Sequence, residues 1–342
     1  MKTKGKATSF DIAHFAGVSQ STVSRALRNS PLVNEETRRK VWDIAKKLNY
    51  KVDKNASNLR TQQSATLAIL LFEDPTGDES QINPFFLNML GSITRACAKE
   101  GYDLLVSFQS ISQDWRAEYE DSHRADGIIL LGYGDYMDYQ SRLQSLLAQN
   151  TKFVCWGAKV EGRQDLTVSC DNYGGGQLAA QHLIANGRKH CVFIGDASEH
   201  SPEFLTRFKG FQETLKSHDI PVGERNIANA ISTEESGYHA TRSLLANNVI
   251  FDALFAASDL IAIGAIKALK EAGLKIPEDV NVVGFDNIAA ANYITPSLTT
   301  IQQNTTLAGQ MLVTNLLSLI RGEPIVDTLL PPKLIVRQST TQ

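Results

Sequence analysis

Residues 10–50 read FDIAHFAGVSQSTVSRALRNSPLVNEETRRKVWDIAKKLNY, a segment in which apolar residues recur at helical spacing. Ser9 can cap a first helix in this segment. The apolar face of that helix consists of Ile12, Ala13 and Ala16. Gly17 can adopt the left-handed conformation that ends a helix, so the sequence predicts a tight turn directly after it.

A second helix is expected over residues 20–29, QSTVSRALRN, with Ser19 as its cap. Its inward face consists of Val23, Ala26 and Leu27, at the spacing i, i+3, i+4. A third helix should begin near Asn34, where the following Glu35 and Glu36 favour the positive end of the helix dipole. Its apolar stripe consists of Val41, Ile44, Ala45 and Leu48. Two short helices joined by a tight turn and followed by a third are typical of a helix-turn-helix domain.

The charge of the chain is divided unevenly, although the net charge is only −3. Residues 1–63 contain 13 Lys and Arg against 5 Asp and Glu, whereas the remainder contains 21 against 32. A basic segment attached to an acidic body can dock on a polyanion while the body is repelled by phosphates. We therefore expect the first segment to bind DNA.

The length of 342 residues allows two or three structural units with sizeable cores. No apolar run is long enough to span a bilayer, and the basic start of the chain lacks the apolar region of a signal peptide, so we expect a cytoplasmic protein. The cysteines are scattered without a CxxC pair, which predicts core residues in place of disulfides or a metal site. They are Cys97, Cys155, Cys170 and Cys191.

Residues 51–64, KVDKNASNLRTQQS, are too poor in apolar residues to pack alone and indicate a linker. Beyond the linker, short apolar runs alternate with amphipathic stretches such as FLNMLGSITRACAKEG at residues 86–101. The apolar runs are TLAILLF, DLLVSF, GIILLG, FVCWG, CVFIG, ALFAAS and NVVGF. This alternation predicts parallel sheets covered by helices, and its length favours two lobes over one.

The segment from Phe10 to Tyr50 resembles the lactose/galactose repressor (LacI/GalR) family of transcription regulators. The similarity continues through Asn83 to Phe86, Arg207, Asp259, Gly284 to Asp286, Leu298 to Ile301 and Leu334 to Thr340. It implies a small all-α helix-turn-helix headpiece and an α/β body of two doubly wound lobes, similar to periplasmic sugar-binding proteins. The expected divisions are 1–51 for the headpiece, 52–65 for a hinge linker, and 66–342 for the body. Lobe 1 should cover about 66–168 and 302–328, and lobe 2 about 169–297 and 329–342.

The second helix of a helix-turn-helix enters the major groove and presents its first turns to base edges. Gln20, Ser21 and Arg25 are the predicted base-reading residues, because Gln pairs with adenine and Arg with guanine in a bidentate manner. Ser19, Thr22 and Ser24 are expected to hold phosphates. The resemblance further implies a hinge helix on the DNA, with Asn55, Ala56 and Leu59 as contacts and Leu59 wedged into the minor groove at a central CG step. Val52 stands where many members carry proline.

The resemblance also implies an effector site between the two lobes, where ligands of such sheets lie outside the carboxyl ends of the strands. Arg207, Ser258, Asp286 and Gln303 would hydrogen-bond the effector, and apolar ring faces would come from Phe85, Phe86 and Trp156. Two positions depart from the family pattern: Ser232 replaces a stacking aromatic residue of some members, and Gly157 replaces an aspartate. These departures predict a reshaped pocket.

A competing interpretation comes from residues 174–179, GGGQLA, which match G-x-G-x-x-A between a strand and a helix. A dinucleotide-binding enzyme would leave the helix-turn-helix unexplained, and the surrounding residues follow the family's own strand-to-helix pattern. We therefore expect no enzyme, no cofactor and no catalytic or metal site.

The sequence predicts a homodimeric repressor of carbohydrate-utilisation genes that binds a palindromic operator, since one helix-turn-helix reads only a half-site. Its effector would be a sugar or sugar phosphate that changes the angle between the lobes and hence the spacing of the headpieces. The alternatives are a purine- or other metabolite-responsive regulator of the same family, and a sugar-binding module without a DNA role.

Overall fold

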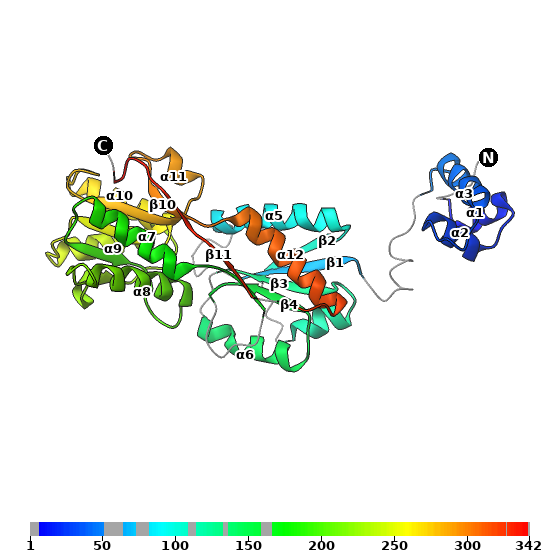
Figure 1. The fold of residues 1–342 in the computed structure, drawn as a ribbon, viewed down its shortest axis with the longest axis horizontal. Coiled ribbons are helices and arrows are strands. Elements are labelled where there is room, and N and C mark those ends of the chain that lie inside the picture. The colour runs from blue at the N-terminus through cyan, green and yellow to red at the C-terminus, as the bar shows by residue number, and fades with distance from the viewer. Residues whose placement is uncertain are drawn as a thin grey trace. The chain divides into compact units, whose positions relative to one another are not determined.

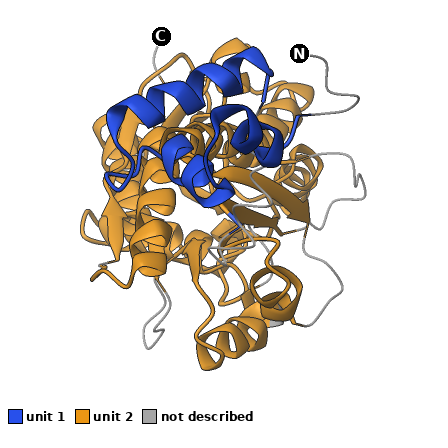
Figure 2. Cartoon of the chain, turned by 90° about the vertical axis from the view of Figure 1, so that its right-hand side faces the viewer, with its two compact units in different colours: residues 1–64 blue, residues 65–342 orange. Residues whose placement is uncertain are grey.

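The computed structural model describes residues 7–50, 64–72, 82–108, 114–132, 136–158, 166–325 and 327–340. The chain forms two compact units, residues 1–64 and 65–342, which Figure 2 draws in blue and orange. Each unit has its own core and is described by itself.

The first unit contains the predicted helices α1 (Ser9–Ala16), α2 (Gln20–Leu27) and α3 (Glu35–Lys47). Gly17 ends α1 with φ +68°, as predicted. Ser19 caps α2 and Asn34 caps α3, each accepting the amide hydrogen of the residue three positions on. The buried core residues are Ile12, Ala16, Val23, Ala26, Val33, Val41 and Ala45. The predicted helix-turn-helix is confirmed.

The start of α1 corrects one detail of the sequence analysis, because Thr8 is the cap and Ser9 is the first helical residue. The Thr8 hydroxyl accepts the Asp11 amide hydrogen, and the Asp11 carboxylate in turn accepts the Thr8 amide hydrogen at 2.7 Å. This reciprocal capping box satisfies two amide groups at once, which a cap at Ser9 would not. The hydrogen bonds from Thr8 also lower the pKa of Asp11 below its ordinary value.

The second unit is built on two six-stranded sheets, in the orders β11-β5-β4-β3-β1-β2 and β12-β10-β9-β8-β6-β7. Every pairing within them is parallel except that of β10 with β12. The strands of the first sheet are β1 (Thr66–Leu71), β2 (Asp103–Phe108), β3 (Gly127–Leu131), β4 (Phe153–Trp156), β5 (Thr167–Cys170) and β11 (Thr328–Leu330). Those of the second are β6 (Cys191–Ile194), β7 (Ile227–Ala228), β8 (Ala253–Ala256), β9 (Asn281–Asp286), β10 (Thr299–Gln302) and β12 (Lys333–Ile335). The predicted two-lobed α/β body is confirmed.

Helices cover both sheets (Figure 1). Lobe 1, the first sheet with its helices, contains α5 (Pro84–Glu100), the short π-helix η1 (Arg116–Asp121), α6 (Tyr136–Ala148) and α12 (Thr305–Arg321). Lobe 2 contains α7 (Asn172–Ala185), α8 (Pro202–Lys216), the 3₁₀ turn η2 (Glu224–Asn226), α9 (Glu234–Ala246), α10 (Asp259–Glu271) and α11 (Ala290–Tyr293). Among the described helices, none is long and apolar enough to cross a membrane. All four cysteines are buried, as expected of core residues.

The chain passes between the lobes three times, after β5, after β10 and after β11. Because β5 ends at Cys170, β10 at Gln302 and β11 at Leu330, these crossings lie within a few residues of the lobe limits proposed above. The crossing after β10 carries Gln303 directly beside the end of β9, since Gln302 is paired with Asp286 in the sheet. This topology brings polar residues together at the carboxyl ends of β8, β9 and β10.

Candidate DNA and effector sites

The exposed face of α2 carries all three predicted base-reading residues, Gln20, Ser21 and Arg25. Val23 and Ala26 on the opposite face are fully buried in the headpiece core. The helix can therefore present its polar side chains without exposing its apolar ones, as a helix that enters a groove requires.

Two of the three residues expected to hold phosphates, Ser19 and Thr22, form a hydroxyl cluster with Ser21 at the start of α2. The Ser19 hydroxyl lies 2.8 Å from those of Ser21 and Thr22 and accepts the Thr22 amide hydrogen at 3.1 Å. The Gln20 amide donates to the Ser9 hydroxyl at 2.9 Å, which holds its side chain against α1. Hydroxyl groups and the positive end of a helix dipole together suit a phosphate oxygen.

Two arginines stabilise the end of α2 and the loop that follows it. Arg28 donates to the carbonyl and hydroxyl of Ser24, so Ser24 is partly engaged within the helix. Arg38, on α3, donates to the carbonyls of Ser30 and Val33 in the loop that follows α2. The predicted hinge contacts Asn55, Ala56 and Leu59 lie outside the described residues.

Two predicted effector residues of lobe 2 form one buried network with Gln303 of the crossing after β10. The Gln303 side-chain amide donates to Asp286 Oδ1 at 2.7 Å, and Arg207 Nη1 lies 3.9 Å from the same oxygen. Arg207 also donates to Asn172 Oδ1 at 2.9 Å and to the carbonyl of Ala257, while its guanidinium carbon lies 3.8 Å from the centre of the Phe285 ring. A guanidinium with partners on this many sides is held in one orientation.

Asp286 has φ +113°, a backbone conformation that residues with a side chain rarely adopt. Such strain persists only where the surroundings enforce it, and it concentrates at functional sites. Arg337 helps to enforce it by donating to the side chain of the neighbouring Asn287 and to the carbonyl of Leu298, both at 2.7 Å. The strained geometry aims the Asp286 carboxylate at Arg207 and Gln303.

The buried Asp259 is a structural residue next to this network. Its carboxylate accepts the Thr300 hydroxyl and, at 2.8 Å, the amide hydrogen of Ile288. Burial raises the pKa of the Asp259 carboxyl well above its ordinary value, and the charge of Asp286 adds to the rise. Asp259 thereby ties α10 to the segment that follows Asp286.

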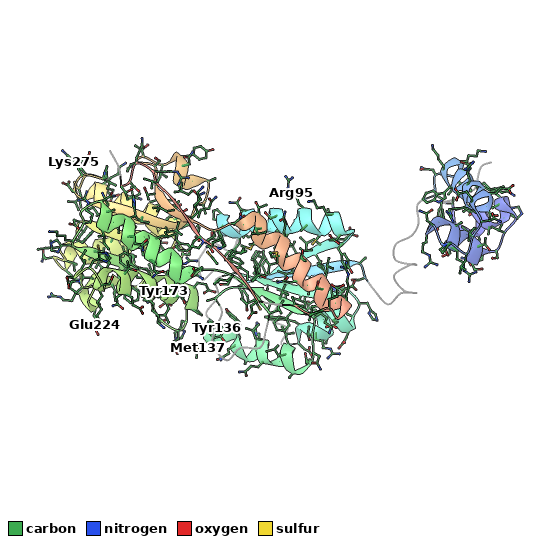
Figure 3. The ribbon with its side chains drawn as sticks, viewed as in Figure 1. Arg95, Tyr136, Met137, Tyr173, Glu224 and Lys275 are labelled. Carbon is green, nitrogen blue, oxygen red and sulfur yellow. The ribbon has the colours of Figure 1, made fainter. Side chains whose placement is uncertain are left out.

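The remaining predicted residues are three aromatic side chains of lobe 1 and Ser258 of lobe 2. Phe85 lies 5.1 Å from Phe86 and 6.0 Å from Trp156, measured between ring centres. Ser258 caps α10, and its hydroxyl accepts that of Ser232 at 2.8 Å. All seven predicted effector residues are buried. The side chains of the two lobes meet along their junction, beside which Figure 3 labels Tyr136 on lobe 1 and Tyr173 on lobe 2.

Sequence reasoning missed three buried polar residues in this region, Asn83, Asn172 and Glu203, and named a fourth, Ser232, only as a departure from the family pattern. Asn83 joins the lobes, because its amide nitrogen donates to Ser232 at 3.1 Å while its oxygen caps the amide of Phe85. Asn172 orients Arg207, and Glu203 reaches the backbone of the opposite lobe. Asn83 and Ser232 lie at positions of the family pattern, which could have pointed to the site. The only sequence sign of Glu203 is its position four residues before Arg207, on the same helix face.

The glycine-rich stretch at residues 174–176 has a packing explanation. A Cβ on Gly176 would lie 2.0 Å from the Arg207 carbonyl oxygen, and one on Gly175 would lie 2.6 Å from the Phe285 ring. The amide of Gly174 is already bonded to the Asp171 carboxylate at 2.8 Å. The glycines let α7 approach α8 closely, and the capping carboxylate occupies the end of α7 where a pyrophosphate would have to bind.

Comparisons with known proteins agree with this architecture. Residues 10–53 match the bacterial regulatory proteins of the lacI family, and residues 180–340 match the periplasmic binding protein-like domain. The HTH-type transcriptional repressor PurR of Photorhabdus laumondii is 32% identical over 97% of this chain and 96% of its own. The chain belongs to the LacI family. The probable HTH-type transcriptional repressor ExuR of Bacillus subtilis is 31% identical over 92% of this chain and 91% of its own.

Solved structures of family members have the same fold. The Lac repressor dimer bound to operator and the anti-inducer ONPF superposes with a TM-score of 0.83 at 25% identity, covering 98% of this chain and 99% of that one. The transcriptional regulator CelR in complex with cellobiose gives a TM-score of 0.73 at 28% identity, covering 97% and 99%.

Proposed function

We propose that this LacI-family protein is a homodimeric repressor that binds palindromic operator DNA through α2 and releases it in response to a sugar bound between the lobes of its body. The observation that carries the proposal is a set of buried groups from both lobes: strained Asp286 bonded to Gln303 and next to Arg207, and the ring cluster of Phe85, Phe86 and Trp156 in lobe 1. Paired acceptors and donors beside apolar rings suit the hydroxyl groups and ring faces of a sugar.

The switch follows from contacts that join the lobes. Besides Asn83 to Ser232, the Tyr136 amide donates to the His200 carbonyl at 2.9 Å across the junction. A ligand that binds among these groups has different contacts in a closed and in an open body, so it can shift the balance between the two. In a dimer the change in lobe angle alters the spacing of the headpieces, and the protein acts in the cytoplasm on genes of carbohydrate utilisation.

Three observations from relatives favour this function over a module without a DNA role. PurR is named a transcriptional repressor and ExuR a probable one, the Lac repressor is a dimer bound to operator, and the regulator CelR is in complex with cellobiose. A purine-responsive regulator is the second candidate, favoured by the likeness to PurR.

Leu59 is proposed to insert into the minor groove of the operator at a central CG step, as the family pattern implies.

The test is selection of binding sites from random duplex DNA by the purified full-length protein, followed by titration of the selected site with panels of sugars and purines. We expect a palindrome bound at least about a thousandfold tighter than unrelated DNA at the same salt, and weaker binding in the presence of one sugar. Absence of any sequence preference would contradict the repressor, and a response only to purines would favour the second candidate.

A further inference from the structure

The effector region contains a buried carboxylate that none of the preceding roles uses. Glu203, in the first turn of α8, is only 8% exposed. Its Oε1 accepts the amide hydrogen of Ala158, which follows β4 in the other lobe, at 2.8 Å. A Cβ built on Gly157 would lie 2.9 Å from the same oxygen. The Glu203 carboxylate therefore occupies the space that a side chain at position 157 would fill.

This position places Glu203 next to both halves of the proposed effector site. Gly157 directly follows Trp156 of the aromatic cluster. Glu203 precedes Arg207 by four residues, so the two side chains lie on the same face of α8. The carboxylate thus contacts the strand end that follows Trp156 and extends from the same helix face as Arg207.

Among the described residues, the buried side chains of this region include more acidic than basic groups. Within the part of the chain that the structure describes, Arg207 is the one buried basic side chain, and it lies beside Asp286. Glu203 has the Ala158 amide as its hydrogen-bond partner among the described residues. A carboxylate has about four acceptor sites, and burying its charge is costly unless donors satisfy it. Glu203 can therefore accept donors from a ligand, and it repels a second anion.

We propose that Glu203 determines the charge selectivity of the effector site: it accepts hydrogen bonds from hydroxyl or ammonium groups of a neutral or amino sugar, and it excludes sugar phosphates and uronates. The proposal rests on the proposed function and narrows its effector class. Of these two effects, the repulsion of anionic sugars should contribute more to selectivity than the hydrogen bonds, because specificity is often achieved by destabilising the complex with the wrong ligand.

The experiment compares wild type with Glu203→Gln in the full-length protein. Glutamine keeps the shape and an oxygen acceptor for the Ala158 amide but removes the charge. The matched control is Glu199→Gln, which removes the same charge from an exposed position four residues earlier. The probes are glucose, galactose and mannose, each as the neutral sugar, the 2-amino sugar, the 6-phosphate and the uronate, with binding measured by calorimetry.

We expect wild type to bind a neutral or amino sugar at least about tenfold tighter than its matched anionic forms. Glu203→Gln should reduce that ratio at least about tenfold, and Glu199→Gln should leave it unchanged. The proposal is wrong if wild type binds a phosphate or uronate as tightly as the neutral sugar or more tightly. It is also wrong if Glu203→Gln has the same affinity ratio as wild type. Neither result would contradict the effector site itself. If no neutral or amino sugar binds the wild type, this proposal fails, and operator selection then decides separately whether the protein is a repressor.

Discussion

The headpiece and the body place their functional groups in opposite ways. On α2 the base-reading candidates Gln20, Ser21 and Arg25 project from a small apolar core into solvent. In the body, Arg207 and Asp286 are buried and bonded to their neighbours. Exposed groups can change without affecting the fold, whereas these buried groups also contribute to the packing of the body. DNA contacts should therefore be separable from stability, and effector contacts only partly so.

The largest expected effect of this difference lies in the headpiece. Arg25→Ala should weaken binding to the selected palindrome by about 1–3 kcal/mol per half-site and relax its base preference, because a bidentate contact is lost. The urea midpoint should stay the same, since Arg25 is exposed. Lys46→Ala, an exposed basic residue late in α3, is the control and should change little. Equal operator affinity of Arg25→Ala and wild type in fluorescence anisotropy would remove α2 from the interface.

A smaller effect is expected from packing in the body. Gly176→Ala should lower the free energy of unfolding by about 1–3 kcal/mol, because its Cβ would overlap the Arg207 carbonyl oxygen and force α7 from α8. The control is Gly223→Ala, whose Cβ would meet nothing within 4 Å. Urea unfolding followed by circular dichroism measures both variants. If Gly176→Ala is as stable as wild type and the protein binds NAD(H), the glycines serve a dinucleotide after all.

The smallest effect concerns the thiols. Burial raises the pKa of Cys97 to about 11 and those of Cys170 and Cys191 to about 12. At pH 8 about one molecule in a thousand or fewer would carry a thiolate at these positions, and only the thiolate reacts readily. Iodoacetamide should therefore label them slowly in the native protein and rapidly in urea, as mass spectrometry would detect. Fast native labelling would show that the body opens more readily than its packing suggests.

Local signals in the sequence were sufficient for most of the fold. Gly17, Ser19 and Asn34 mark helix ends through bonds that span only a few residues, so their roles could be predicted. The cap of α1 was misassigned because Thr8 and Ser9 are both suitable residues, and the contact with Asp11 decides between them. The predicted apolar runs located seven of the described strands, namely β1, β2, β3, β4, β6, β8 and β9, and missed β5, β7, β10, β11 and β12. The order of the strands in the sheets came only from the structure.

The site was predictable only where its residues match a known pattern. Arg207, Asp286 and Gln303 were found in that way, and the structure brings them together. Glu203 was missed because its partner Ala158 is 45 residues away on the other lobe, and no local pattern encodes that contact. The sequence showed that position 157 lacks a side chain, but it did not show that the carboxylate of Glu203 occupies that space.

The most direct test of the central claim is an operator titration of wild type, Arg25→Ala and Asp286→Ala with and without the sugar that binds wild type. Arg25→Ala should lose operator affinity but bind the sugar normally. Asp286→Ala should bind the operator yet lose the response, with sugar affinity reduced at least about tenfold, since a hydrogen bond to a charged group contributes roughly 1.5–3 kcal/mol. If Asp286→Ala releases the operator at the same sugar concentration as wild type, the junction between the lobes is not the effector site.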